Sequence, residues 1–336
     1  MTRTLVLRSA TVALALAACY SEGADPPTRP AAPSLDGEPK AELISAMNKA
    51  AGESLDLLPA SARREAHREN SDRERKSWDF WPSRYPGARM DQVDATTRAK
   101  VEELLRQALS EDGYRRLRDV QALEPYNPWR SPYYSVMVFG EPEKSWGWRY
   151  QGHHISLNFT VGPGDSFSAT PLFLGTPPLS KVGVAGGHRP LGEVEDRARE
   201  LYQSFSGQQR AKADIQRPGH TYLPERIPRA KPYGASGIAS GDLSPSQRDS
   251  LAALVAAYVD NVSLALRPGT PDLSSARFSW AGSDRAGQNH YYRVESDEWV
   301  VEYDSRDGGS HIHSVWRTFN GDFGEDLLAA HLAANH

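Results

Sequence analysis

The chain has 336 residues and a formal net charge of −4, from 39 basic and 43 acidic side chains. This balance gives no reason to expect a nucleic-acid partner, because surfaces that bind nucleic acid carry an excess of lysine and arginine. A single cysteine excludes a disulfide framework and a metal site built from cysteines.

The N-terminal residues have the form of an export signal. Arg3 and Arg8 precede an apolar run, residues 10–18, that is too short to span a bilayer. The run ends in LAAC, which resembles a bacterial lipobox with Cys19 as the lipidated residue. We therefore expect a signal peptide over residues 1–18 and an exported lipoprotein that faces the periplasm or the cell exterior. The alternative is an ordinary signal peptide with an incidental cysteine.

Residues 19–40 are rich in proline, alanine and polar residues and lack hydrophobic periodicity, so we expect a flexible tether behind the lipid. No later segment is long and apolar enough to be a transmembrane helix. The sequence therefore predicts contact with the membrane only through the lipid on Cys19.

Two amphipathic segments of the chain resemble each other. Residues 93–109 align without gaps on residues 243–259, with Arg98 on Arg248. Each segment has a helix N-cap candidate at the same place, Asp94 and Ser244, and the second adds a proline at the first helical position and a glutamine that completes a capping box. The pattern predicts two corresponding helices.

The similarity extends to both sides of these helices. Residues 60–66 resemble 206–213, and residues 146–159 align with 290–304, which places Arg149 on Arg293. We interpret this as an α+β fold with two related halves, each made of helices followed by antiparallel strands. Chance similarity is the alternative. The halves are residues 41–187 and 188–336.

A metal site is expected near the end of the chain. Asp307-Gly308 is typical of a hairpin turn, and a two-residue turn pairs Asp304 with His311 and Glu302 with His313. The four side chains then share one face of the sheet, which suits zinc, iron, manganese or copper. The alternative is a ladder of histidines and carboxylates that binds no metal.

The stretch GHHISLNF contributes a further histidine. On a continuous strand over residues 148–160, alternation directs His153 to the core, where we expect a bond to a backbone carbonyl. His154 then lies on the polar face with Asn158. If the halves pack about a pseudo-two-fold axis, His154 and Asn158 approach the predicted metal cluster.

Aromatic residues are concentrated just upstream of this stretch. Trp146 and Trp148, together with residues such as Tyr126 and Trp129, are candidates for a groove that binds a small molecule. Aromatic residues in β-rich domains are equally typical of the core.

Several ordered motifs resemble those of a bacterial and fungal family catalogued as domain of unknown function 3500. The likeness runs from about Ala41 to His331, and it implies an extracytoplasmic protein whose histidines belong to the family pattern. It implies no particular activity. The motifs are WGW (146–148), GHH (152–154) with Asn158, TPLFLG (170–175), HIHSVWR (311–317) and DFGEDLL (322–328).

The sequence thus favours an extracytoplasmic lipoprotein with a divalent metal bound by His154, His311, His313 and Glu302 or Asp304. As a hydrolase or oxidase it activates water or oxygen on the ion, with the carboxylate that does not bind metal as general base. In that interpretation Trp146, Trp148 and Asn158 contact the small-molecule substrate. The competing interpretation is a non-catalytic lipoprotein that binds a ligand and whose histidines are structural.

Overall fold

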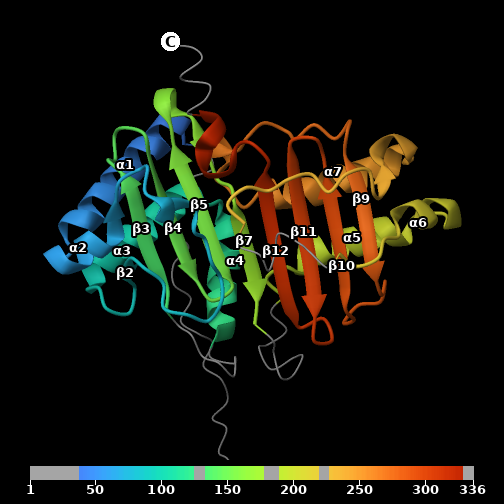
Figure 1. Ribbon diagram of the computed structural model, residues 1–336, viewed down its shortest axis with the longest axis horizontal. Coiled ribbons are helices and arrows are strands. Elements are labelled where there is room, and N and C mark those ends of the chain that lie inside the picture. Colours follow the sequence, from blue (N-terminus) through green and yellow to red (C-terminus); the bar gives the residue numbers. More distant parts are fainter. Residues whose placement is uncertain (1–37, 125–132, 178–188, 219–226, 328–336) are drawn as a thin grey trace, which may run out of the picture. The chain divides into compact units, whose positions relative to one another are not determined.

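A computed structural model describes residues 38–124, 133–177, 189–218 and 227–327, which all belong to one compact unit, Leu35–His336 (Figure 1). The predicted signal peptide, Cys19 and nearly all of the tether lie outside the described residues, as do Tyr126, Trp129 and His331. Among the described residues, no helix is long and apolar enough to cross a membrane.

The described residues form one mostly antiparallel sheet of twelve strands with helices packed on it, which confirms the predicted α+β class. The main path of the sheet runs β1-β3-β4-β5-β7-β12-β11-β10-β9-β8, with β2 paired to β3 and β6 to β5. The strands are β1 (His67–Arg68), β2 (Ala88–Arg89), β3 (Ser135–Gly140), β4 (Trp146–Gly152), β5 (Ile155–Val161), β6 (Phe167–Ser168), β7 (Leu172–Thr176), β8 (Ile238–Ala239), β9 (Arg277–Gly282), β10 (His290–Glu295), β11 (Trp299–Arg306) and β12 (His311–Thr318).

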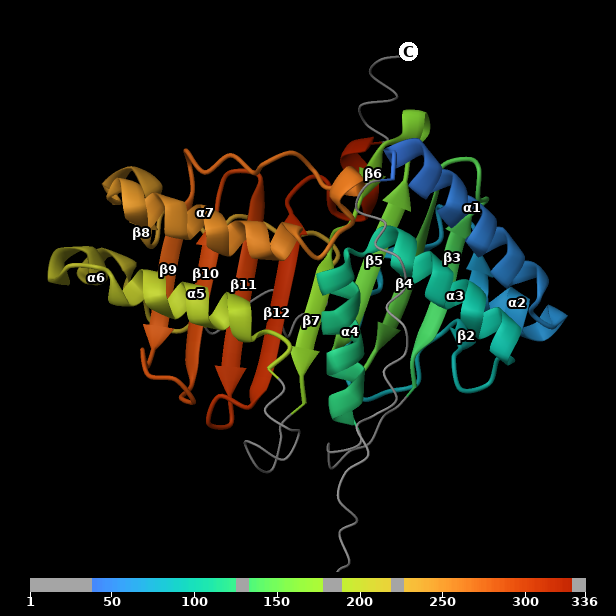
Figure 2. The same cartoon turned by 180° about the vertical axis from the view of Figure 1, so that it is seen from behind.

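The α-helices cover one face of this sheet (Figure 2). The two helices predicted from their caps are both present. The Asp94 side chain accepts a hydrogen bond from the Thr97 N–H at 2.7 Å, and Ser244 and Gln247 form the reciprocal capping box. The helices are α1 (Lys40–Asp56), α2 (Ala60–Ala66), α3 (Ala95–Ala108), α4 (Glu111–Leu123), α5 (Gly192–Gln203), α6 (Gly207–Ala213) and α7 (Pro245–Val259).

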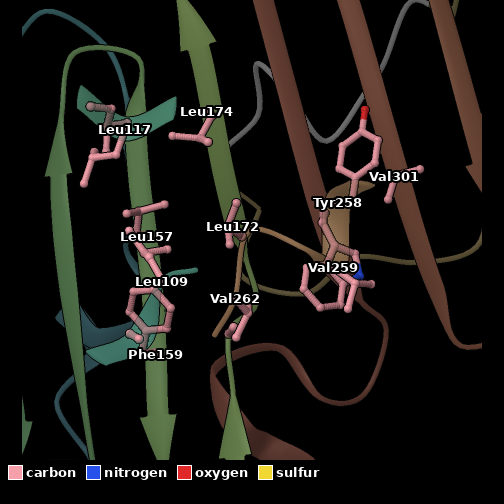
Figure 3. Close-up of a cluster of buried hydrophobic side chains, with 14 of the residues drawn as sticks. Leu109, Leu117, Leu157, Phe159, Leu172, Leu174, Tyr258, Val259, Val262 and Val301 are labelled. Carbon is pink, nitrogen blue, oxygen red and sulfur yellow. The ribbon is translucent and has the colours of Figure 1, made fainter. Parts of the chain in front are cut away.

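The main hydrophobic core lies between the helices and the sheet. Leu157 and Leu172 extend from the strands toward Leu109 and Tyr258 on the helical side (Figure 3). Burial of such side chains stabilises the fold by roughly 1.5–3 kcal/mol each relative to exposure. This core therefore holds the central strands β5, β7 and β12 in place.

The opposite face of the sheet is covered by loops, and its buried side chains include many charged ones. Arg149 on β4 donates to Glu74 at 2.7 Å, and Arg317 on β12 donates to Asp322 at 2.7 Å. Paired charges can be buried because each partner offsets the other's loss of hydration. Since both faces are buried, these strands lack the simple alternation of apolar and polar residues that identifies a half-exposed sheet.

The order of elements recurs on the two sides of the central β7–β12 pair. Helices α1, α2 and α3 precede β3, β4, β5 and β7, and helices α5, α6 and α7 precede β9, β10, β11 and β12. Arg149 pairs with Asn158 across β4 and β5 as Arg293 pairs with Glu302 across β10 and β11. Helix α4 follows only the first set. The origin of the two halves by duplication stays a prediction.

Candidate metal site

The two neighbouring histidines lie in a tight turn, so the predicted continuous strand over residues 148–160 is wrong. Strand β4 ends at Gly152, which pairs with Ile155 at the start of β5, and His153-His154 connect them. The φ angle of His154 is +61°, a left-handed conformation that is uncommon for residues other than glycine. This turn, rather than strand alternation, positions the two imidazoles, whose ring centroids lie 4.0 Å apart.

Neighbouring segments hold the backbone of His154 on both sides. Its N–H donates to the Phe80 carbonyl at 3.0 Å, and its own carbonyl accepts from the Gly175 N–H on β7 at 2.8 Å. Backbone strain persists only where the surroundings determine the conformation, and these two bonds supply that constraint. The position of the His154 ring is therefore set by the tertiary structure.

His153 is buried, as expected, but its partner is a carboxylate. Its Nδ1 lies 2.9 Å and 3.1 Å from the two carboxylate oxygens of Glu124, which directly follows α4. His153 and Glu124 thus form a buried imidazole–carboxylate pair, and the predicted bond to a backbone carbonyl stays a prediction.

The hairpin that carries the other two histidines has a longer turn than predicted. Arg306 pairs with His311, and Asp304 pairs with His313, so the turn contains four residues, 307–310. Asp307, Gly308 and Gly309 all have left-handed φ angles. A two-residue turn has only two such positions, so three successive left-handed residues require a longer turn. The predicted pairing is wrong by two residues. An even shift keeps each side chain on its predicted face, so His311 and His313 still lie side by side.

The three histidines converge through their Nε2 atoms. His154 Nε2 lies 3.1 Å from His311 Nε2 and 3.3 Å from His313 Nε2. In the part of the chain that the structure describes, these residues form a group whose ligand atoms all lie within 4.8 Å of one another. The imidazoles are therefore close enough together to hold one metal ion.

A glycine on the intervening strand makes this convergence possible. Strand β7 separates β5 from β12, and Gly175 pairs with His313. A Cβ atom at position 175 would lie 2.9 Å from Cδ2 of His154 and 2.5 Å from the Ile312 carbonyl oxygen. Because glycine has no side chain, the His154 ring can lie over β7 and reach the histidines of β12.

The surroundings favour neutral imidazoles, the form that binds metals. Burial lowers the pKa of His154 and that of His313 well below the usual 6.5, and the neighbouring histidines lower both further. Burial also lowers the pKa of His311, against a partly opposing effect of the Asp307 carboxylate. Asp307 Oδ2 lies 3.1 Å from His311 Nδ1, so it orients this ring with Nε2 toward the other two.

The three rings border a cavity of about 190 Å³. Phe80, Trp81, Pro82 and His153 complete its lining. The Phe80 ring stacks on Phe173 with a centroid distance of 4.0 Å and meets His313 edge-on at 5.0 Å. The histidines thus face a small space whose other walls are mainly apolar.

The structure does not bring the two predicted carboxylates into this group. Glu302 accepts hydrogen bonds from Tyr291 at 2.6 Å and Tyr233 at 2.8 Å. Asp304 pairs with Arg306 at 2.8 Å and with Arg217. Both carboxylates are buried on the loop-covered face, but their oxygens point to these partners. The expected ligand set of histidines plus Glu302 or Asp304 is therefore reduced to the histidines, and a catalytic role for either carboxylate stays a prediction.

The residues predicted to contact a ligand lie elsewhere. Trp146 and Trp148 are 0% and 1% exposed in the main core, and Trp146 Nε1 donates to Asn48 at 2.8 Å. Asn158 is buried and donates to the Pro171 carbonyl at 2.9 Å. None of the three lines the cavity. The core alternative for the tryptophans fits their positions.

Sequence reasoning missed Phe80, Trp81, Gly175 and Asp307 as components of the site. Phe80 and Trp81 belong to a short aromatic run, WDFWP, just after the highly charged residues 63–76. The change from charged to aromatic residues was the sequence signal that could have indicated their role. Gly175 ends a motif that was noted without a role. Its function depends on which strands become neighbours, which local patterns do not show.

The chain was compared with known proteins. No curated protein and no solved structure matches it. A family model described as "Protein of unknown function (DUF3500)" matches residues 40–325, which cover most of the chain and include His154, His311 and His313. The chain therefore belongs to the DUF3500 family, as its motifs predict.

Proposed function

We propose that this protein is a metal-dependent enzyme in which His154, His311 and His313 bind one divalent transition-metal ion through Nε2. The ion would activate water or oxygen toward a small molecule in the adjoining cavity, as in a hydrolase or an oxidase. The observation that carries the proposal is the convergence of three buried Nε2 atoms at a mainly apolar cavity.

The geometry fits a single ion. Two nitrogens that each lie about 2.0–2.1 Å from one tetrahedral ion are about 3.3 Å apart, close to the 3.1 Å and 3.3 Å between the imidazoles. Three protein ligands leave one coordination position open, which is typical of catalytic rather than structural sites. An all-imidazole set suits zinc, copper or iron better than manganese, which prefers oxygen ligands.

The chain's own residues have separate tasks in this proposal. Three neutral imidazoles leave the full charge of the ion uncompensated, which strengthens its pull on the electrons of a bound water. Asp307 orients His311, and Gly175 makes room for His154. Phe80 and Trp81 limit the access of bulk water. Glu302 bonds to tyrosines and Asp304 to arginines that do not line the cavity, so the proposal gives these carboxylates no contact with substrate.

The competing function is a non-catalytic binding protein with structural histidines. One observation favours it: a proton on His154 Nε2, shared between His311 and His313, also satisfies the two short contacts. In that state Nδ1 of His154 is an acceptor, and this atom is buried without a hydrogen-bond partner among the described residues. A metal on Nε2 instead requires a proton on Nδ1. A buried N–H donor without a partner costs more free energy than a buried nitrogen acceptor without one.

Metal analysis of the untagged protein distinguishes the two functions. We expect about one zinc, copper or iron ion per chain after purification without chelators. The double variant His311→Ala/His313→Ala should lose the ion and remain folded. His67→Ala, at the edge strand β1, is the matched control and should retain it. A folded wild-type protein that stays free of metal after incubation with each of these ions would contradict the proposal.

We also propose that the protein is an exported lipoprotein attached to the membrane through Cys19. The lipobox-like LAAC sequence supports this attachment. Replacement of Cys19 by serine should move the full chain from the membrane fraction to the soluble extracytoplasmic fraction. If the wild-type chain is already in the soluble fraction and the replacement changes nothing, the alternative of an ordinary signal peptide is favoured.

A further inference from the structure

The cavity beside the three histidines has an unusual lining for a site that would hold a cation. Apart from the histidines, its described lining consists of Phe80, Trp81 and Pro82, and no described lysine, arginine, aspartate or glutamate borders it. A ligand there has one strongly polar partner, the ion itself. The rest of the molecule must be uncharged, since burial of a second charge in an apolar pocket is unfavourable without a partner.

The size of the cavity limits the ligand further. Its volume is about 190 Å³. Apolar protein cavities of about 150 Å³ accept one benzene molecule, and pockets for drug-sized ligands begin at about 300 Å³. The space next to the histidines therefore fits one six-membered ring with a small substituent, and it does not fit a fused two-ring system.

Aromatic rings form one wall of the cavity. Trp81 lies nearly parallel to Phe80, with an interplanar angle of 17° and a centroid distance of 5.9 Å, and Phe80 stacks in turn on Phe173. Trp81 is 48% exposed, so neighbouring side chains leave much of its indole uncovered. A flat aromatic ligand can stack on such a surface at low conformational cost.

The wall is fixed relative to the histidines. The Asp79 carboxylate accepts from the Phe80 N–H at 2.6 Å and from the Trp81 N–H at 3.1 Å, and the Tyr85 hydroxyl donates to the Trp81 carbonyl. The Phe80 carbonyl accepts from the His154 N–H. One hydrogen-bonded unit thus connects the backbone of the aromatic wall to that of His154, which restrains the position of the wall relative to the proposed metal site.

We propose that the substrates of this site are phenols with a single ring, which bind the ion through their oxygen and stack on Trp81. This inference rests on the proposed metal site. A phenol supplies a ring of the size that the cavity accepts and one oxygen donor, which would take the open coordination position in place of water or, at a five-coordinate ion, lie beside the activated water or oxygen. The described lining has no charged partner for phosphate esters or amino acids, and only histidine and tryptophan nitrogens for the several hydroxyl groups of a sugar, so we expect none of these as substrates.

Calorimetric titration of the zinc-loaded full-length protein with phenol tests the inference. We expect saturable binding of one phenol per bound zinc. Cyclohexanol, of similar size but without an aromatic ring, and 1-naphthol, with two rings, should each bind at least about tenfold more weakly. Trp81→Ala should weaken phenol binding about tenfold, and Trp81→Phe should restore most of it. Leu264→Ala, at another exposed apolar side chain, should leave it unchanged.

The outcomes distinguish a failure of the proposed substrate class from a failure of the proposed metal site. If no zinc binds, the proposed metal site fails, and the substrate class fails with it. If zinc binds stoichiometrically and phenol does not, only the substrate class is overturned. Equal affinity for cyclohexanol would overturn the stacking argument, and equal affinity for 1-naphthol would overturn the size limit.

Discussion

The turn between β4 and β5 and the turn between β10 and β11 share a backbone hydrogen bond to a neighbouring segment, but among the described residues only the first carries a candidate metal site. His153-His154 form the first turn and Asp297-Glu298 the second. The carbonyl of the second residue in each turn accepts a hydrogen bond at 2.8 Å, from a residue of β7 in the first turn and from the residue that follows β12 in the second. The donors are Gly175 for the first turn and Phe319 for the second.

The two turns differ in what surrounds this shared arrangement. The histidines are buried, whereas Asp297 and Glu298 are exposed. His154 has a left-handed φ angle, and Glu298 is not among the described residues with a positive φ. Glycine at the donor position leaves room for an imidazole over the strand, whereas the donor to the second turn, Phe319, has a large and buried side chain. The comparison shows that the scaffold permits the site and that a few side chains create it.

The largest effect is expected when a proposed metal ligand is removed from the first turn. His154→Asn removes one of three metal ligands but keeps a residue that tolerates the left-handed conformation. We expect metal affinity to fall at least about a hundredfold, while the free energy of unfolding of the metal-free protein changes by less than about 1 kcal/mol. Competition with a chromogenic chelator measures the affinity. Glu298→Asn, in the exposed turn, should change neither quantity, and equal losses in both variants would contradict a specific role for His154.

A smaller perturbation tests the gap over β7. Gly175→Ala places a methyl group against the His154 ring and the Ile312 carbonyl. We expect a destabilisation of about 1–3 kcal/mol from overpacking, together with weaker metal binding. Thermal unfolding with and without metal provides the measurement. At Gly52, inside α1, a methyl group meets no atom within 4 Å, so Gly52→Ala should stabilise the protein by about 0.5–1 kcal/mol.

The next effect concerns the orientation of His311. Asp307→Asn retains the size of the side chain but removes the negative charge beside Nδ1 of His311. Because such partners tune metal ligands and Asp307 is largely exposed, we expect a loss of metal affinity of about tenfold. Asp297→Asn in the other turn is the matched control. An unchanged affinity in Asp307→Asn would mean that packing alone orients His311.

The smallest effect is expected at the carboxylate that the hairpin pattern favoured as a ligand. Glu302→Gln should leave the metal content at the wild-type value, because Glu302 faces Tyr233 and Tyr291 rather than the histidines. An amide oxygen can still accept from a tyrosine, so the protein should remain folded. Loss of the ion in this variant would restore Glu302 to the ligand set.

Much of the local structure follows from the sequence. The caps Asp94 and Ser244 predict the starts of α3 and α7, because a side-chain acceptor at this position satisfies backbone N–H groups that the helix leaves unpaired. Asp307-Gly308 predicts a turn between two strands. The spacing of His311 and His313 places both on one face whichever even register the hairpin adopts.

Other features do not follow from local patterns. The turn at His153-His154 lacks the usual glycine or asparagine, so the local pattern predicts a continuous strand. Hydrogen bonds with Phe80 and Gly175 stabilise the turn instead. The four-residue length of the β11–β12 turn depends on three successive left-handed residues. The destinations of Trp146 and Trp148 depend on which face the helices cover, and both faces of these strands are buried.

By itself, the sequence determined the fold class, the helix starts, the family and the pair of histidines on one strand, because these depend on short-range hydrogen bonds, periodicity and motif order. The sequence also predicted that His154 joins this pair, although through strand alternation about a pseudo-two-fold axis. The folded chain brings it there by a left-handed turn over Gly175, directs the carboxylates to tyrosines and arginines, and places Phe80 and Trp81 at the cavity. The physical reason is that these contacts join segments far apart in the chain, across a strand whose glycine leaves the space between them.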